Sequence, residues 1–98
     1  MRFSIIIPVY NRPQEVDELL ESLCAQTFKD FEVVVVEDGS SEKCDTVCEK
    51  YANRLALSYH FKPNSGPGPS RNYGAEHSQG EYLIILDSDV IVPENYLE

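Results

Sequence analysis

The feature of this sequence that most constrains its fold is the regular alternation of strand-like and helix-like segments. Four short runs are rich in β-branched and aromatic residues, and they cover residues 3–9, 31–37, 55–61 and 82–86. Helical patterns separate these runs, so the predicted element order is β-α-β-α-β-α-β. Strands that alternate with helices form parallel sheets with right-handed crossovers. We therefore predict an α/β fold in which helices sandwich an open, mostly parallel sheet.

The four strand-like runs differ in the distribution of their apolar residues. Residues 3–9, 31–37 and 82–86 are nearly continuous apolar runs, which is typical of strands covered on both faces. In residues 55–61 larger apolar side chains alternate with smaller or polar ones, which is typical of a half-exposed strand. We therefore expect the third strand to lie at an edge of the sheet.

Three predicted helices connect the strands. In the first, apolar residues recur at spacings of three and four, as on the buried face of an amphipathic helix: Val16, Leu19, Leu20, Leu23 and Cys24. We expect Asn11 to cap this helix, with Gln14 completing a capping box. A serine at position 40 or 41 is the predicted cap of the second helix. The third is predicted over residues 70–78, with Gly80 ending it.

Length and charge restrict the class of protein. The chain has 98 residues, which is enough for one small domain. Eight basic and 17 acidic residues give a net charge of -9, which argues against nucleic acid or an anionic membrane as the main partner. The longest apolar run, residues 5–9, is far shorter than the roughly 20 residues of a membrane span, and a secretory signal pattern is absent. We expect a cytoplasmic location, and membrane association of a longer protein stays open.

The cysteines are interpreted as reduced thiols of the core. Cys24, Cys44 and Cys48 are odd in number, and the last two are four residues apart among apolar neighbours. A zinc site would need a third and a fourth ligand, and neither His60 nor His77 is placed by sequence to supply one.

Polar residues follow three of the four predicted strands. They include Tyr10 and Asn11 after the first strand, Asp38 after the second, and residues 87–89 after the fourth. In an open parallel sheet, ligands bind beyond the carboxyl ends of the strands, so these residues should meet at one edge. The turn after the first strand contains no glycine, which argues against a dinucleotide-binding fold and against a phosphate-binding Walker loop.

The two aspartates after the fourth strand suggest a metal site. Asp87 and Asp89 are two residues apart, so in an extended backbone both side chains project to the same side. Carboxylates are ligands that Mg²⁺ and Mn²⁺ prefer. An ordinary acidic turn is the alternative for so short a motif. The apolar run 82–86 directly before it favours the metal site, because it places both carboxylates at the end of a strand.

Three further residues are candidates for nucleotide contacts. Arg71 is predicted in the first turn of the third helix, where the helix dipole opposes a cation and an anionic diphosphate would offset that repulsion. Tyr10 could stack on a base. Asp38 could accept a hydrogen bond from a base N–H. Their structural alternatives are a surface arginine, core packing, and the turn that an Asp-Gly pair commonly forms.

Five segments taken together carry a family resemblance: residues 4–11, 26–33, 36–40, 70–74 and 80–89. In this order they resemble the family 2 glycosyltransferases, and the resemblance covers nearly the whole chain. It implies a Rossmann-like GT-A fold with strand order 3-2-1-4. It also implies a nucleotide-diphosphate-sugar donor, most often a UDP-sugar, a Mn²⁺ or Mg²⁺ ion, and inversion at the anomeric carbon.

The resemblance also implies roles for single residues. Pro8 and Tyr10 would line the base pocket, Asn11 would also bind the nucleotide, and Asp38 would bind the base. Arg71 would lie near the nucleotide, Asp87 would face the ribose and the metal, and Asp89 would bind the metal. The catalytic base of the family normally lies well after this D-x-D motif, and only nine residues follow Asp89. We therefore expect residues 1–98 to be the nucleotide-sugar-binding portion of a longer GT-A domain, inactive alone, with its base beyond residue 98.

Two other classes of nucleotide-binding protein share parts of this pattern. Sugar nucleotidyltransferases use a related sheet but carry a glycine-rich basic loop after the first strand, which residues 11–13 do not supply. A non-catalytic nucleotide-binding module is the other alternative. The acceptor, whether saccharide, lipid or protein, cannot be read from these residues. In the order 3-2-1-4 the fourth strand lies at an edge, so we expect this chain to self-associate through that strand or the adjacent face.

Overall fold

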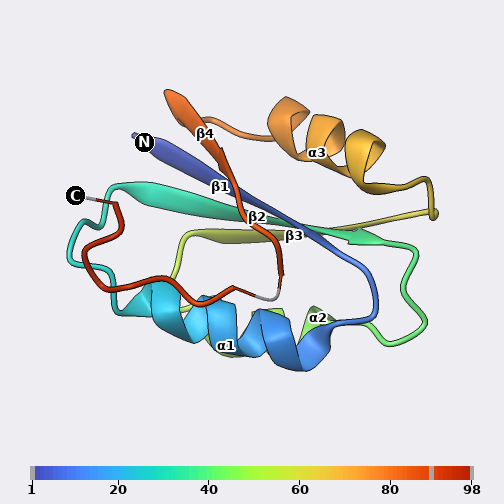
Figure 1. The fold of residues 1–98 in the computed structure, drawn as a ribbon, viewed down its shortest axis with the longest axis horizontal. Helices are drawn as coiled ribbons and strands as arrows, with labels where there is room; N and C mark the ends of the chain where they lie inside the picture. Colours follow the sequence, from blue (N-terminus) through green and yellow to red (C-terminus); the bar gives the residue numbers. More distant parts are fainter. Residues whose placement is uncertain (1, 89, 98) are drawn as a thin grey trace.

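The computed structural model describes residues 2–88 and 90–97, apart from the side chain of Pro67. The chain forms three layers, with a sheet in the middle, two helices on one face and one helix on the other (Figure 1). The elements are β1 (Phe3–Val9), α1 (Pro13–Cys24), β2 (Phe31–Asp38), α2 (Asp45–Tyr51), β3 (Leu57–Lys62), α3 (Pro67–Glu76) and β4 (Tyr82–Ile85). Among the described residues, no helix has the length and apolar character needed to cross a membrane.

The sheet confirms the predicted fold class and strand order. Its four described strands are parallel and lie in the order β3-β2-β1-β4. Ile5 of β1 pairs with Val33 of β2 on one side and with Ile84 of β4 on the other. The ends of the predicted strands lie within two residues of the observed ones, and β3 is an edge strand as expected. The carboxyl ends of β1 and β2 therefore lie at the same edge of the sheet.

The two faces of the sheet carry hydrophobic clusters of unequal size. The larger cluster lies on the face covered by α1 and α2, and it includes Ile5, Ile7, Val9, Val16, Leu19, Leu20, Leu23, Val33 and Val35. The smaller cluster contains Ile6, Val34 and Val36, against which Tyr73 and Ala75 of α3 pack. Burying an aliphatic side chain of this size stabilises a fold by about 1.5–3 kcal/mol, so the α1 face provides most of the core.

The helix caps predicted from the sequence are wrong. Helix α1 begins at Pro13 with Arg12 in the N-cap position, and no side chain caps it. Asn11 has a positive φ of 54°, and its Oδ1 accepts hydrogen bonds from the backbone N–H groups of Ser41 (2.9 Å) and Glu42 (3.0 Å). The Asn11 side chain thus accepts hydrogen bonds from the loop after β2 and does not cap α1. In α2 the N-cap position is taken by Cys44.

Helix α3 also differs from the prediction. It begins at Pro67, three residues before Ser70, so residues 66–69, which precede the predicted helix, provide its N-cap and first turn. Proline is tolerated there because the first N–H groups of a helix have no partner within the helix. Arg71 therefore lies in the second turn, and the dipole argument for its role does not hold. Gly80 lies beyond the helix end and donates its N–H to Ser4 Oγ at 2.7 Å.

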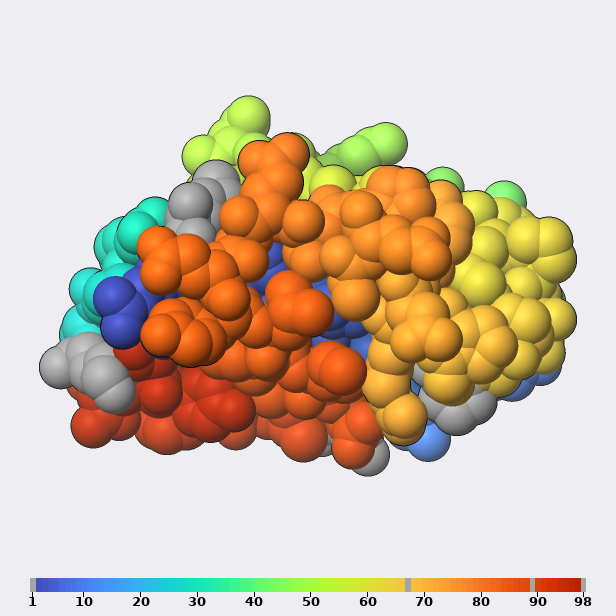
Figure 2. All heavy atoms as spheres, turned by 90° about the horizontal axis from the view of Figure 1, so that it is seen from above, coloured from blue at the N-terminus to red at the C-terminus, as the bar shows by residue number. Residues whose placement is uncertain are grey.

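Strand β4 is an edge strand with exposed apolar side chains. It pairs with β1 on one side, and no other described strand pairs with it. Tyr82 is 54% exposed, Leu83 49% and Ile85 46%, and Figure 2 shows the atoms of β4 at the surface beside α3. Unpaired edges with apolar side chains favour association between chains. Self-association through this edge stays a prediction.

We expect the sedimentation coefficient of this chain to increase across a tenfold range of concentration, because paired β4 edges would bury these side chains. A Leu83→Lys variant places a charge on the edge and is expected to stay monomeric at the same concentrations. A wild-type chain that sediments as a monomer throughout the range would show that the edge is tolerated.

Candidate functional site

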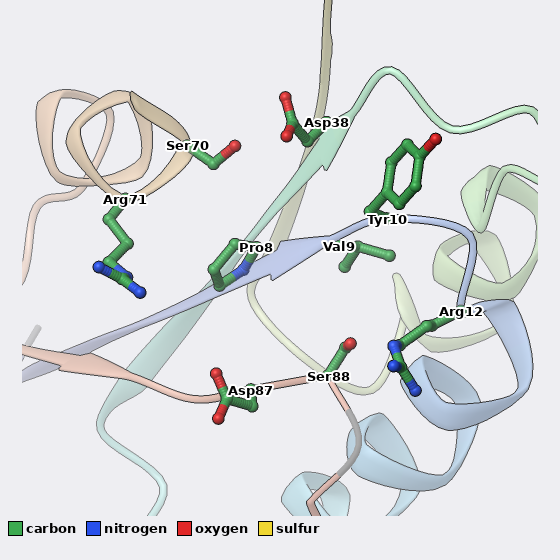
Figure 3. Close-up of a pocket in the computed structure, with 9 residues that line it drawn as sticks. All are labelled: Pro8, Val9, Tyr10, Arg12, Asp38, Ser70, Arg71, Asp87 and Ser88. Carbon is green, nitrogen blue, oxygen red and sulfur yellow. The ribbon is translucent and has the colours of Figure 1, made fainter. Parts of the chain in front are cut away.

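A cavity of about 480 Å³ lies at the carboxyl edge of the sheet (Figure 3). Its lining comes from the ends of β1 and β2, the loop before α1, helix α3 and the segment after β4: Pro8, Val9, Tyr10, Arg12, Asp38, Ser70, Arg71, Asp87 and Ser88. Pockets for small ligands typically have volumes of about 300–1,000 Å³. The cavity is therefore large enough for a small molecule.

Most of the nucleotide-binding residues predicted from the sequence line this cavity. They are Pro8, Tyr10, Asp38, Arg71 and Asp87. Asn11 is not in the lining, because its side chain is bonded to the loop after β2. Asp89 lies outside the described residues, so its predicted role stays a prediction. Tyr10 is 53% exposed, and Figure 3 shows its ring beside the cavity, on the same side as Asp38.

The sequence reasoning missed four residues of the lining: Val9, Arg12, Ser70 and Ser88. A signal was present for Arg12, because it is a basic residue in the loop at the ligand edge of a strongly acidic chain. Ser70 and Ser88 are buried, and they became visible only when the fold placed them beside β1. Short polar side chains of this kind carry no periodic pattern that would distinguish a cavity wall from a turn.

Arg12 and Arg71 are the basic residues of the cavity, and they approach it from opposite sides (Figure 3). Within residues 2–88 and 90–97, neither guanidinium has an ion pair, a hydrogen bond or an aromatic ring contact. The other six basic side chains have such partners: Arg2, Lys29, Lys43, Lys50, Arg54 and Lys62. Guanidinium groups bind carboxylates and phosphates through paired hydrogen bonds. The cavity therefore offers an anionic ligand two cations that have no partner in the described part of the chain.

Asp38 fixes the loop between β3 and α3. Its Oδ1 accepts hydrogen bonds from Lys62 Nζ and from the backbone N–H of Ser65, both at 2.8 Å. Its Oδ2 accepts one from the backbone N–H of Gly66 at 2.9 Å. The side chain is only 9% exposed. Asp38 is therefore a structural anchor as well as a residue of the cavity.

The pKa of Asp38 reflects two opposing effects. Burial of the carboxyl group would raise its pKa, since burial disfavours the charged form. The hydrogen bonds from Lys62, Ser65 and Gly66 favour the charged form, and together they hold the pKa below its ordinary value. At neutral pH Asp38 is therefore an anion, and among the described residues its Oδ2 accepts one hydrogen bond, from Gly66.

Asp87 provides a carboxylate at the open side of the cavity. It follows β4, its side chain is exposed, and it has no side-chain partner within the described residues. An unpartnered carboxylate fits Mg²⁺ or Mn²⁺, whose shells are usually completed by water and phosphate oxygens. In the described part of the chain, no three His, Cys, Asp or Glu side chains gather closely enough to hold a metal ion.

Comparisons with known proteins agree with this geometry. The family model described as glycosyl transferase family 2 matches residues 4–98. An uncharacterized glycosyltransferase of Rickettsia typhi is 40% identical over 95 residues, which are 97% of this chain and 29% of that protein. The poly(ribitol-phosphate) beta-N-acetylglucosaminyltransferase TarS of Staphylococcus aureus is 40% identical over 102 residues, covering all of this chain and 18% of TarS. The chain thus spans less than a third of the length of these relatives.

Solved structures show the same similarity. TarS residues 1–349 in complex with UDP-GlcNAc match with a TM-score of 0.91 and 41% identity, over 96% of this chain and 28% of that one. The Pyrobaculum calidifontis mannosyltransferase PcManGT, in complex with GDP-Man and Mn²⁺, matches with a TM-score of 0.87 and 28% identity, over 94% and 28%. These matches, with the strand order, confirm the predicted GT-A fold. The chain belongs to glycosyl transferase family 2.

Proposed function

We propose that this chain binds the donor of a metal-dependent glycosyltransferase that moves a sugar from a UDP-sugar to an acceptor hydroxyl with inversion. The observation that carries the proposal is the pair of arginines that face one cavity without a partner among the described residues, in a chain of net charge -9. An anion is the ligand that such a pair favours. The complexes of TarS with UDP-GlcNAc and of PcManGT with GDP-Man support a nucleotide sugar as that anion.

The cavity suggests how each part of the donor would lie. Tyr10 and Pro8 would contact the base, and Asp38 Oδ2 would accept a hydrogen bond from a base N–H. The diphosphate would lie between Arg12 and Arg71, which approach from opposite sides. In a uridine nucleotide, the uracil ring has one N–H, which lies between two carbonyl groups. A carboxylate that is already held in place can accept a hydrogen bond from this N–H. This arrangement supports UDP as the nucleotide.

Asp87, with Asp89 outside the described residues, would hold Mn²⁺ or Mg²⁺ against the donor phosphates. When bound, such an ion supplies positive charge that stabilises a leaving diphosphate. The protein's own arginines would contribute to the same stabilisation from fixed positions. The acceptor hydroxyl and the carboxylate base that activates it belong, in this proposal, to residues beyond position 98, and the enzyme would work in the cytoplasm.

We expect calorimetry to show weak binding of UDP in Mn²⁺ or Mg²⁺ and binding at least tenfold weaker in a chelator, because the acidic chain repels a diphosphate that carries no metal. Asp87→Ala and Asp89→Ala are expected to lose most of this difference. Asp30→Ala removes an equal charge beside the amino end of β2 and serves as the matched control. Equal affinity in Mn²⁺ and in chelator would refute the metal dependence, and no binding in either would refute the donor site.

A further inference from the structure

Glu37 is a buried acidic residue that takes no part in the cavity. It precedes Asp38 in β2, its exposed fraction is 0%, and it belongs to the face of the sheet that α2 covers. Its Oε1 accepts hydrogen bonds from the Cys44 backbone N–H at 2.7 Å and from the Tyr59 hydroxyl at 3.0 Å. Its Oε2 accepts one from the Ser40 hydroxyl at 2.5 Å. Each of these three partners donates to the carboxylate, so Glu37 also fixes the orientation of the Ser40 hydroxyl.

The Ser40 hydroxyl links Glu37 to the loop that carries two cavity residues. Its oxygen accepts a hydrogen bond from the Asn11 backbone N–H at 2.8 Å. The Asn11 side chain returns to the same loop through the N–H groups of Ser41 and Glu42. The loops after β1 and β2 are therefore joined in both directions, by a backbone donor of Asn11 and by its side-chain acceptor.

These hydrogen bonds between the two loops set the direction of the chain between Tyr10 and Arg12. Asn11 has a φ of 54°, a left-handed conformation that is uncommon for residues other than glycine and persists where the surroundings hold it. Neither Tyr10 nor Arg12 has a side-chain hydrogen bond to another described residue. Their approach to the cavity therefore depends on the backbone at Asn11, which the hydroxyl of Ser40 holds.

We propose that Glu37 and Ser40 are positioning residues for the ligand: Glu37 orients the Ser40 hydroxyl, Ser40 holds Asn11, and Asn11 directs Tyr10 and Arg12 toward the cavity. The inference rests on the proposed function in its choice of UDP as the ligand. If Glu37 had only a structural role, it would stabilise the start of α2 and the position of β3. It would then have no effect on ligand binding by Arg12. The two roles differ in their coupling to Arg12.

The test is a double-mutant cycle on UDP affinity in Mn²⁺, measured by calorimetry. Ser40→Ala removes the acceptor of Asn11 and leaves Glu37 bonded to Cys44 and Tyr59, so the fold should survive. We expect it to weaken UDP binding about fivefold, the effect of one lost hydrogen bond of ordinary net strength. Arg12→Ala should then weaken binding less in the Ser40→Ala background than in the wild type. Arg71→Ala, on a different element, should have the same effect in both backgrounds.

Two conservative changes serve as controls. Tyr59→Phe removes one donor to Glu37 without touching Ser40, and Ser78→Ala removes a hydroxyl that bonds the Ala75 carbonyl outside the cavity lining. Both are expected to keep UDP affinity within twofold of the wild type. Glu37→Gln, which leaves the Ser40 hydroxyl without its carboxylate acceptor, should reproduce the Ser40→Ala effect and its coupling to Arg12. Additive losses for Ser40 and Arg12 would overturn the proposal.

A second readout separates this proposal from the proposed function. If the wild-type chain does not bind UDP, the proposed donor site is wrong. The positioning role of Ser40 is then tested by the chemical shifts of backbone amides in NMR spectra. Ser40→Ala should then shift the amide signals of Tyr10, Asn11 and Arg12 and leave those of Ser70 and Arg71 unchanged. Unchanged signals at positions 10–12 in a folded variant would overturn the positioning role whether or not UDP binds.

Discussion

Asp38→Ala is expected to lower the midpoint of thermal unfolding by more than about 10 °C, because it removes the carboxylate that anchors the loop between β3 and α3. The substitution leaves the Lys62 ammonium, whose side chain is 12% exposed, without its carboxylate, and it frees the N–H groups of Ser65 and Gly66. Removing one partner of a fully buried ion pair costs roughly 3–5 kcal/mol, and because this pair is part-buried the cost should lie near the lower end of that range. In a domain of this size, each kcal/mol shifts the midpoint by about 4–8 °C.

The matched control is Glu21→Ala, which breaks an exposed ion pair with Arg54 whose N–O distance is 3.4 Å. Such surface pairs contribute about 0–1 kcal/mol, so this variant should unfold within a few degrees of the wild type. Calorimetry or circular dichroism at neutral pH measures both. If Asp38→Ala shifted the midpoint as little as Glu21→Ala, the anchoring role of Asp38 would be wrong.

The pH dependence of the same pair of proteins provides an independent check. Because folding lowers the pKa of Asp38, its stabilising effect is fully present above the unfolded pKa of about 3.9 and is lost as the pH falls through the lower folded value. The difference in stability between wild type and Asp38→Ala should therefore be constant near neutral pH and shrink below about pH 4. Asp17 also has a lowered pKa, owing to hydrogen bonds from Lys50 and Tyr51. Because Asp17 is present in both proteins, its contribution cancels in the difference in stability.

Replacing Arg12 and Arg71 together by alanine is expected to reduce UDP affinity at least about 100-fold. A hydrogen bond to a charged group contributes about 1.5–3 kcal/mol, so each single substitution should weaken binding about tenfold or more. Neither side chain has a partner among the described residues, so the fold should lose little stability. The effect should appear in affinity and hardly at all in the unfolding midpoint.

Arg54→Ala is the control for lost positive charge, because Arg54 is exposed and lies outside the cavity lining. It should leave UDP affinity within about twofold. Arg71→Lys tests geometry, since lysine keeps the charge and loses the planar fork of donors. If the double variant bound UDP like the wild type, the diphosphate would not lie between the two arginines.

The sequence predicted the parts of this fold that depend on burial. The apolar runs specify strands because side chains covered on both faces leave no polar positions, and the order of the elements restricted the topology to a parallel sheet. The positions of the helix ends depend on single hydrogen bonds, and the sequence does not show which of the possible bonds form. Asparagine is a residue type that often caps helices, yet the side chain of Asn11 is hydrogen-bonded to the loop after β2, 30 residues away.

The candidate site was predictable in position but not in the roles of its residues. Strand ends placed Tyr10, Asp38 and Asp87 together, because parallel strands end at one edge, whereas the helix-dipole argument for Arg71 did not hold. Nothing in the sequence showed that Asp38 would also hold the start of α3, since its partners at 62, 65 and 66 are about 25 residues distant. Glu37, its neighbour, faces the opposite layer because adjacent residues of a strand point to opposite faces.

The two faces of the sheet are packed unequally, and the cavity takes one arginine from each. Arg12 lies at the start of α1, over the larger hydrophobic cluster, whereas Arg71 belongs to α3, which rests on the small cluster of Ile6, Val34 and Val36. A ligand held by both arginines restricts the lightly packed helix against the sheet, and part of its binding free energy offsets the conformational entropy that α3 loses. A nucleoside without phosphates leaves α3 free, so the binding entropy should become more unfavourable as phosphates are added.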